Sequence, residues 1–124
     1  MPLLVERCPA LNLFGLTGSV PTTPFFTAGA DEDALYAAWV DVVVTSPGTA
    51  GSLVVSLSYS NGTAAAGASI LNSPAINLAV IGEQGFLLGV LHSVANQPIS
   101  YGTAVTGAAG NPVYSLRIRL SPLG

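Results

Sequence analysis

Two apolar runs between residues 34 and 59 predict the strands around which the rest of the chain is organised. In the second run, Leu53, Val55 and Leu57 alternate with Val54 and serines. This period of two turns one face of a strand inward and the other outward. The first run, ALYAAWVDVVVT, is apolar on both faces, as is usual for a strand in the middle of a sheet or at a contact between subunits. We expect the remaining strands to be laid against this pair, whose members are joined by the turn-forming segment SPGTAGS.

Further short apolar runs, separated by turn signals, continue to the C-terminus without a persuasive helix. Pro21 and Pro24 favour a short edge strand, because proline cannot donate to a β ladder. Asn61-Gly62 predicts a hairpin turn, and the segment GEQG at residues 82–85 predicts a tight connection. We expect strands near residues 11–20, 22–27, 34–45, 53–60, 76–81, 86–92, 99–107 and 113–122.

This pattern predicts an all-β fold, a single-domain antiparallel β-sandwich that is jelly-roll-like and has about eight strands over residues 11–124. Residues 1–10 carry two prolines and the opposed charges of Glu6 and Arg7, and we interpret them as an N-terminal arm. Such an arm can fray, or it can add a strand to the sheet edge of a neighbouring chain. The apolar residues Leu3, Leu4 and Val5 favour docking, which makes them the candidate anchor.

The scarcity of charged residues indicates that the chain assembles with other copies of itself. Only 7% of the 124 residues are charged, against about 25% in average soluble proteins. No charged residue occurs between Asp41 and Glu83, or between Glu83 and Arg117. Because small monomers rarely expose large apolar patches, we expect part of this neutral surface to be buried in a homo-oligomer.

Membrane and nucleic-acid partners are not expected. A spanning helix needs about 20 mostly apolar residues in a row, and the sequence has no such run. The first fifteen residues lack the basic and long apolar regions of a signal peptide, so we expect synthesis in the cytoplasm. With a net charge of −3 and no lysine, the chain lacks the cations that bind a phosphate backbone. Cys8 is single, and we interpret it as a small buried residue.

The sequence also lacks catalytic, metal-binding and cofactor-binding motifs, so we expect that the protein is not an enzyme and binds no cofactor. His92 is the single histidine, no G-x-S-x-G elbow is found, and the acidic segment AGADED at residues 28–33 lacks the spacing of a calcium loop. Asp41 and Glu83 are isolated acids rather than a glycosidase pair. We expect Asp41 to pair with Arg117 or Arg119 across a sheet or an interface.

Four segments together carry a family resemblance: LYAAWVDVVVT, GSLVVSLSYSNG, ISYGTAVTG and PVYSLRIRLSPLG. Their strand and turn style resembles small all-β virion proteins of tailed bacteriophages, namely head-decoration, head-fibre and tail-associated proteins. The resemblance implies a jelly-roll-like, often trimeric structural protein of the virion, without catalytic residues, that binds the major capsid protein or tail lattice.

Two functional hypotheses follow. In the first, a structural virion protein assembles as a homo-oligomer, with Trp39, Val43, Leu87 and Leu91 as candidate intersubunit contacts. In the second, a lectin-like or receptor-binding β-sandwich recognises carbohydrate through its loops, and Tyr101 is the main nearby candidate residue.

Overall fold

The computed structural model describes residues 10–27, 34–59, 69–93 and 96–123, and in these residues the chain is all β. No helix among them is long and apolar enough to cross a membrane. Nine strands follow one another along the chain: β1 (Ala10–Leu16), β2 (Thr23–Thr27), β3 (Ala34–Ser46), β4 (Ala50–Tyr59), β5 (Ser69–Asn72), β6 (Ile76–Asn77), β7 (Gly82–Ser93), β8 (Pro98–Ala109) and β9 (Val113–Pro122).

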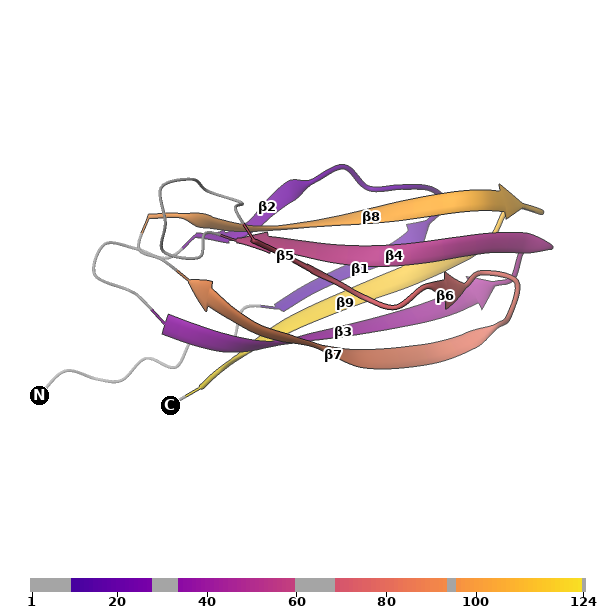
Figure 1. Cartoon of the computed structure of the whole chain (residues 1–124). Helices are drawn as coiled ribbons and strands as arrows, with labels where there is room; N and C mark the ends of the chain where they lie inside the picture. The colour runs from indigo at the N-terminus through magenta and orange to yellow at the C-terminus, as the bar shows by residue number, and fades with distance from the viewer. Residues whose placement is uncertain (1–9, 28–33, 60–68, 94–95, 124) are drawn as a thin grey trace, which may run out of the picture.

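The strands form two antiparallel sheets packed face to face, as Figure 1 shows. The first sheet has the order β1-β9-β3-β7, and the second has the order β2-β8-β4-β5 with β6 also paired to β4. Because β5 and β6 both pair with β4, they occupy one strand position. The sandwich therefore has eight strand positions, and the chain crosses repeatedly between the sheets, which is a jelly-roll arrangement. The predicted fold class is confirmed.

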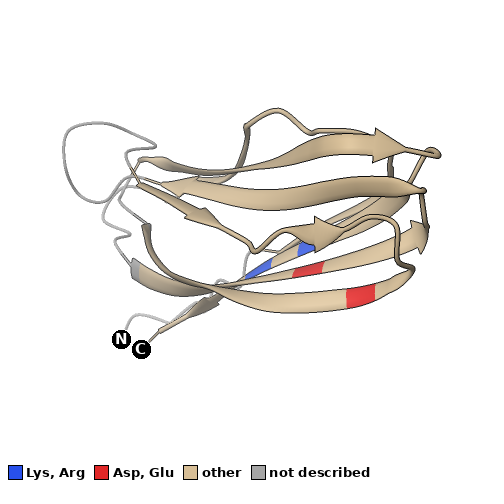
Figure 2. Ribbon diagram, turned by 45° about the vertical axis from the view of Figure 1, so that its right-hand side comes forward, with Lys and Arg blue, Asp and Glu red and all other residues tan. Residues whose placement is uncertain are grey.

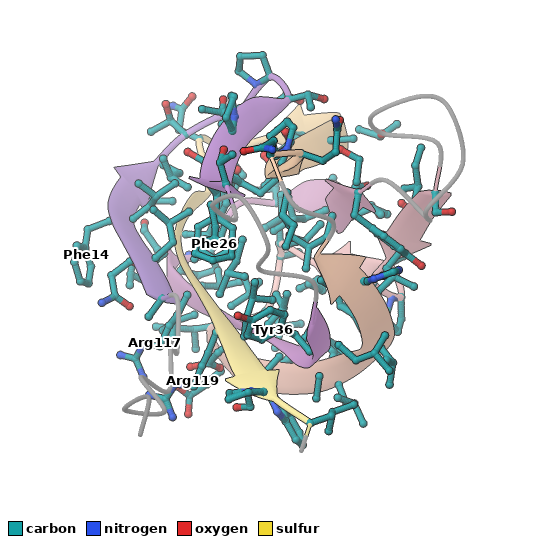
Figure 3. All side chains as sticks on the ribbon, turned by 90° about the vertical axis from the view of Figure 1, so that its left-hand side faces the viewer. Phe14, Phe26, Tyr36, Arg117 and Arg119 are labelled. Atoms are coloured by element: carbon teal, nitrogen blue, oxygen red, sulfur yellow. The ribbon has the colours of Figure 1, made fainter. Side chains whose placement is uncertain are left out.

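Period-two alternation explains how the core forms. Along β4, Leu53, Val55 and Leu57 are fully buried, and along β9, Leu116, Ile118 and Leu120 are buried in the same way. Phe26 and Tyr36 meet edge to face between the two sheets, with ring centroids 6.1 Å apart (Figure 3). Burying a side chain of this size contributes about 1.5–3 kcal/mol, so the two inner faces supply the main driving force for folding.

A hydrogen-bonded network around Tyr114 joins the two sheets at one end of the core. The hydroxyl of Tyr114 on β9 donates to the carbonyl oxygen of Gly18 (2.7 Å) and lies 2.8 Å from Oγ1 of Thr103 on β8. The same Thr103 Oγ1 accepts the backbone N–H of Val20 (2.8 Å). Burial raises the pKa of Tyr114, since the ionised phenolate would lose its hydration. The network fixes the β1–β2 connection across both sheets.

The two runs that organise the sequence do not pair with each other. Strand β3 pairs with β7 and β9, whereas β4 pairs with β5, β6 and β8. In the connection between them, the N–H of Gly48 donates to the Leu78 carbonyl oxygen (3.0 Å) and that of Thr49 to the Ala109 carbonyl oxygen (2.8 Å). Since these bonds tie the connection to the second sheet, the chain crosses the sandwich here instead of closing a hairpin.

The predicted tight connection at residues 82–85 is wrong, because these residues open the long strand β7. Asp41 to Val44 of β3 pair with residues 82–85 one by one, and this ladder overrides the turn preference of the glycines. The preceding strand is correspondingly short: the side-chain oxygen of Asn77 accepts the N–H of Ala79 (2.9 Å) and ends β6 in a turn. The Asn61-Gly62 hairpin, the acidic loop and residues 1–9 of the predicted arm lie outside the described residues. Ala10, the last residue of that arm, is the first residue of β1.

Candidate interaction surface

The outward side of the first sheet combines large apolar side chains with charged ones. We call it the Trp39 face, and it comprises Asn12, Phe14, Leu35, Ala37, Trp39, Asp41, Val43, Glu83, Gly85, Leu87, Val90, Ser115, Arg117, Arg119 and Ser121. Strand pairing builds it in rows: Trp39 lies between Arg119 on β9 and Leu87 on β7, and Asp41 lies between Arg117 and Gly85. Every second residue of each strand thus reaches the same surface.

Apolar side chains on the Trp39 face are unusually exposed. Trp39 is 47% exposed, Leu87 54% and Val90 50%, and Phe14 on β1 reaches 75%. Figure 3 shows Phe14, Arg117 and Arg119 pointing away from the sandwich. Small monomers rarely leave several large apolar side chains exposed on one side of a sheet, so we treat this face as the candidate interaction surface.

All four charged residues within the described part of the chain lie on this face, and Figure 2 shows that they belong to strands of the first sheet. Arg117 donates from Nε to Oδ1 of Asn12 (3.1 Å), and its Nη1 lies 3.9 Å from Oδ2 of Asp41. The predicted pairing of Asp41 with an arginine is therefore confirmed for Arg117. Because the Arg117 side chain is 55% exposed, this ion pair contributes less than about 1 kcal/mol.

Asp41 also faces a second carboxyl group. Its hydrogen bond to Glu83 on β7, followed by its negative charge, raises the pKa of Glu83, while the positive charge of Arg117 partly opposes that rise. The face thus holds a row of mixed charge in which Arg117 and Glu83 flank Asp41. Such a row can complement a surface that also carries both signs of charge.

A shallow groove of about 450 Å³ runs across the middle of the Trp39 face. Gly85 lines the groove without a side chain, and a Cβ placed there would fit in ordinary contact with Oδ1 of Asp41 at 3.8 Å. Its walls mix apolar, cationic and anionic side chains, and its lining consists of Trp39, Val40, Asp41, Gly85, Phe86, Arg117, Arg119 and Ser121.

The structure brings three of the four candidate contact residues to this face. Trp39 and Leu87 are opposite each other on neighbouring strands, and Val43, which is half-buried, pairs with Glu83. The prediction that Leu91 is an intersubunit contact is wrong. Leu91 is 1% exposed and belongs to the core, so it cannot be a surface contact. A β-bulge is the cause, because Ala38 pairs with Gly89 and Trp39 with Leu87. The extra residue, Leu88, inverts the alternation that follows it.

Other predicted residues are placed as follows. Tyr101 is 8% exposed and packs edge to face on Phe25 at 6.4 Å, so it is a core residue and not a loop contact. His92 is half-buried on β7 opposite Leu35. Leu3, Leu4 and Val5 lie outside the described residues. The exposed positions that sequence reasoning missed are Phe14, which occupies the polar phase of its strand, and Val90, which follows the bulge.

The outward side of the second sheet has a different groove, of about 510 Å³. Hydroxyl-bearing and small residues line it, namely Ser19, Val20, Pro21, Thr22, Ser56, Gly102, Thr103 and Ala104. In the part of the chain that the structure describes, no three His, Cys, Asp or Glu residues gather where they could hold a metal ion.

Comparison with known proteins gives no family: no family model matches the chain, and no curated protein has a significant match. Solved structures with a similar course include the acid-stable capsid of the Helicobacter pylori bacteriophage KHP30 (TM-score 0.43, 16% identity, 96% of this chain and 88% of that one). A second is the structure of Bacillus endospore appendages, which form disulfide-linked pili (TM-score 0.38, 13% identity, 97% of this chain and 88% of that one). A third is desmodium yellow mottle tymovirus (TM-score 0.36, 14% identity, 100% of this chain and 94% of that one). With TM-scores below 0.5, these likenesses carry no argument about function.

Proposed function

We propose that this protein is a non-enzymatic structural component of a virus particle that assembles as a homo-oligomer through its Trp39 face. The observation that carries the proposal is the exposure of Phe14, Trp39, Leu87 and Val90 on one side of one sheet. Burial of such side chains between copies would remove apolar area from water at about 25 cal/mol per Å². A solitary chain would leave this surface in water.

Fold and charge support the same proposal. Jelly rolls build viral capsid proteins, lectins and cupins, so the architecture is compatible with a virion subunit but does not by itself assign that function. The Trp39 face carries two arginines and two carboxylates. Mixed charges around an apolar centre suit a partner surface that also carries both signs of charge.

The oligomer that we propose is a trimer, and its location is the virion, bound to the capsid or tail lattice. Both follow from the resemblance of the strand segments to auxiliary proteins of tailed bacteriophages. Mass spectrometry of purified particles from the virus of origin tests the location. Detection of the chain at a fixed ratio to the major capsid or tail protein is expected, and its absence from intact particles would contradict a virion role.

The oligomeric state tests directly whether the exposed apolar side chains of the Trp39 face contact another copy. Light-scattering chromatography of the purified chain should give one species with three times the 12.5 kDa mass of the chain, unchanged over a hundredfold dilution. A monomer at every concentration would mean that the Trp39 face is not a contact between copies.

A second candidate function is carbohydrate binding, favoured by the hydroxyl-lined groove on the second sheet. Thr22 and Ser56 supply polar groups there, and the backbone of Val20 and Thr22 packs closely against Gly102. A glycan array decides between the two functions. Reproducible binding that is lost in Thr22→Val and Ser56→Ala variants would support a lectin-like module, whereas an array without binding leaves the structural role.

A further inference from the structure

The two sheets have four edge positions, and one of them differs from the others. β1 is seven residues long with an irregular register, β2 is five residues long and contains Pro24, and β5 and β6 are four and two residues long on either side of Pro74. β7 is twelve residues long and contains no proline. Natural proteins usually shorten or interrupt edge strands to prevent pairing with other chains, and β7 lacks these devices over its first half.

The outer edge of β7 is open in the part of the chain that the structure describes. β3 is the one described strand that pairs with β7, and no backbone hydrogen bond of the connecting segments reaches it (Figure 1). From Gly82 to Leu87 the pairing with β3 is regular, and the bulge at Leu88 ends this stretch. Six consecutive residues therefore offer a regular template for one more strand.

We propose that residues 3–8 of a second copy of this chain add a strand to β7, antiparallel to residues 82–87. The inference deepens the proposed function and rests on it, since it names the segment through which one copy binds the next. The segment LLVERC has the length of the template, and Pro2 and Pro9 border it. Proline cannot donate to the ladder, so it suits the two ends of such a strand.

Side-chain chemistry selects the register. With Leu3 opposite Leu87, the outward side of the new pair also places Arg7 opposite Glu83, so an apolar pair and an ion pair form together. The inward side places Leu4 opposite Phe86 and Glu6 opposite Gln84.

Other registers lose these matches. A shift of one residue moves every side chain to the other face. A shift of two residues in one direction places Arg7 opposite Ile81, and in the other it places Arg7 opposite Gly85 and Leu3 opposite the bulge.

The segment cannot come from the same copy. Strand β1 begins at Ala10 on the opposite edge of the sheet, in the row of Arg119, Trp39 and Leu87. A strand beyond β7 lies four strand spacings away, about 19 Å, whereas the two residues from Cys8 to Ala10 reach at most about 7 Å. The contact therefore joins the β7 edge of one copy to the β1 side of the next. It is a head-to-tail interface, which is the type of contact that a cyclic trimer uses.

Engineered disulfides test the register. In a Cys8→Ser background, Leu3→Cys combined with Leu87→Cys should give covalent multimers on a non-reducing gel, because opposite residues on antiparallel strands have Cβ atoms close enough for a disulfide. The matched control combines Leu3→Cys with Ala104→Cys, an exposed position on the second sheet, and should stay non-covalent. A disulfide within one chain, or equal cross-linking in the control, would overturn the proposal.

Charge exchange provides a second readout that does not depend on cysteine. Arg7→Glu and Glu83→Arg should each weaken the oligomer about tenfold or more by sedimentation velocity, and the double exchange should restore it, since the pair is re-formed with opposite sign. Single variants without effect, or a double variant as weak as the singles, would contradict the pairing.

The outcomes separate this inference from the proposed function. A chain without residues 2–8 that remains a stable oligomer would overturn the strand addition and leave assembly through the Trp39 face intact. A full-length chain that is monomeric at every concentration would overturn both. Loss of the oligomer on deletion, together with the Leu3–Leu87 cross-link, supports the strand addition.

Discussion

The two outward sides of the sandwich come from the same alternation but present different surfaces. Every second residue of β4 and β8 points out of the second sheet, and there serines, threonines and small residues dominate, with Ile70 at one edge. The corresponding positions of β3, β7 and β9 carry Trp39, Leu87 and the four described charged residues. The inward positions of both sheets are equally apolar.

If the proposed function holds, the difference means that folding and binding depend on separate sets of residues. Inward residues of both sheets can meet the same demand for burial, because each is covered by the opposite sheet. Outward residues face no such demand, so large apolar side chains there are explained by a partner rather than by the core. Substitutions on the two outward sides should therefore have different consequences.

Replacing the apolar centre of the Trp39 face should have the largest effect. Trp39→Ser combined with Leu87→Ser removes two side chains whose burial between copies is worth about 1.5–3 kcal/mol each. We expect at least a hundredfold weaker association, since about 1.4 kcal/mol corresponds to a factor of ten. Sedimentation equilibrium measures the change.

The control for this variant is Val54→Ser on the outward side of the second sheet, which should leave the association constant unchanged. A double variant that is as oligomeric as the parent, or a control that dissociates, would remove the contrast between the two faces.

Substitutions of inward residues should destabilise the fold by similar amounts in the two sheets. Ile118→Ala under the first sheet and Leu57→Ala under the second both truncate side chains with no exposed area, and each should lower the free energy of unfolding by about 2–5 kcal/mol. Urea unfolding at one fixed protein concentration compares them, because assembly also contributes to stability. A large loss at one site and almost none at the other would show that the sheets do not share one core.

Tyr114→Phe should cost about 1–3 kcal/mol of unfolding free energy, because it leaves the Gly18 carbonyl and the Thr103 hydroxyl short of a partner. Urea unfolding gives the value. Tyr59→Phe is the matched control at the end of β4, and we expect it to change stability by less than about 0.5 kcal/mol. Equal costs in both variants would argue against a specific role for the Tyr114 network.

The smallest predicted effect concerns pH. The pKa of Glu83 is raised in the folded chain above its ordinary value of 4.5, so Glu83 takes up a proton on folding and the fold gains stability as the pH falls through this raised pKa. At neutral pH Glu83 is ionised, and this gain is absent.

Glu83→Gln should therefore be slightly more stable than the parent at pH 7, and the difference should shrink as the pH approaches 4.5. Urea midpoints at several pH values test this in an Arg7→Gln background, which removes the charge that we place opposite Glu83. A difference that grows with falling pH would contradict the sign.

Local pattern determined much of this protein. A period of two along residues 53–60 and 113–122 was sufficient to predict strands and their buried sides, because alternation depends on the backbone geometry of each strand alone. The run at residues 34–45 predicted a strand that is apolar on both faces, and the three runs together predicted an all-β sandwich. It also placed Trp39 and Asp41 on one face and Arg117 and Arg119 together on another strand. The candidate surface was therefore largely visible in the sequence.

Pairing between distant segments decided the rest. Strands β3 and β4 adjoin in sequence but lie in opposite sheets, residues 82–85 are strand because β3 extends beside them, and the bulge at Leu88 buries Leu91. None of these depends on local preference, since a ladder is specified by both of its strands and a single extra residue inverts all that follows. The tertiary structure therefore decided the exposure of the residues that follow the bulge, where Leu91 is buried and Val90 remains at the surface.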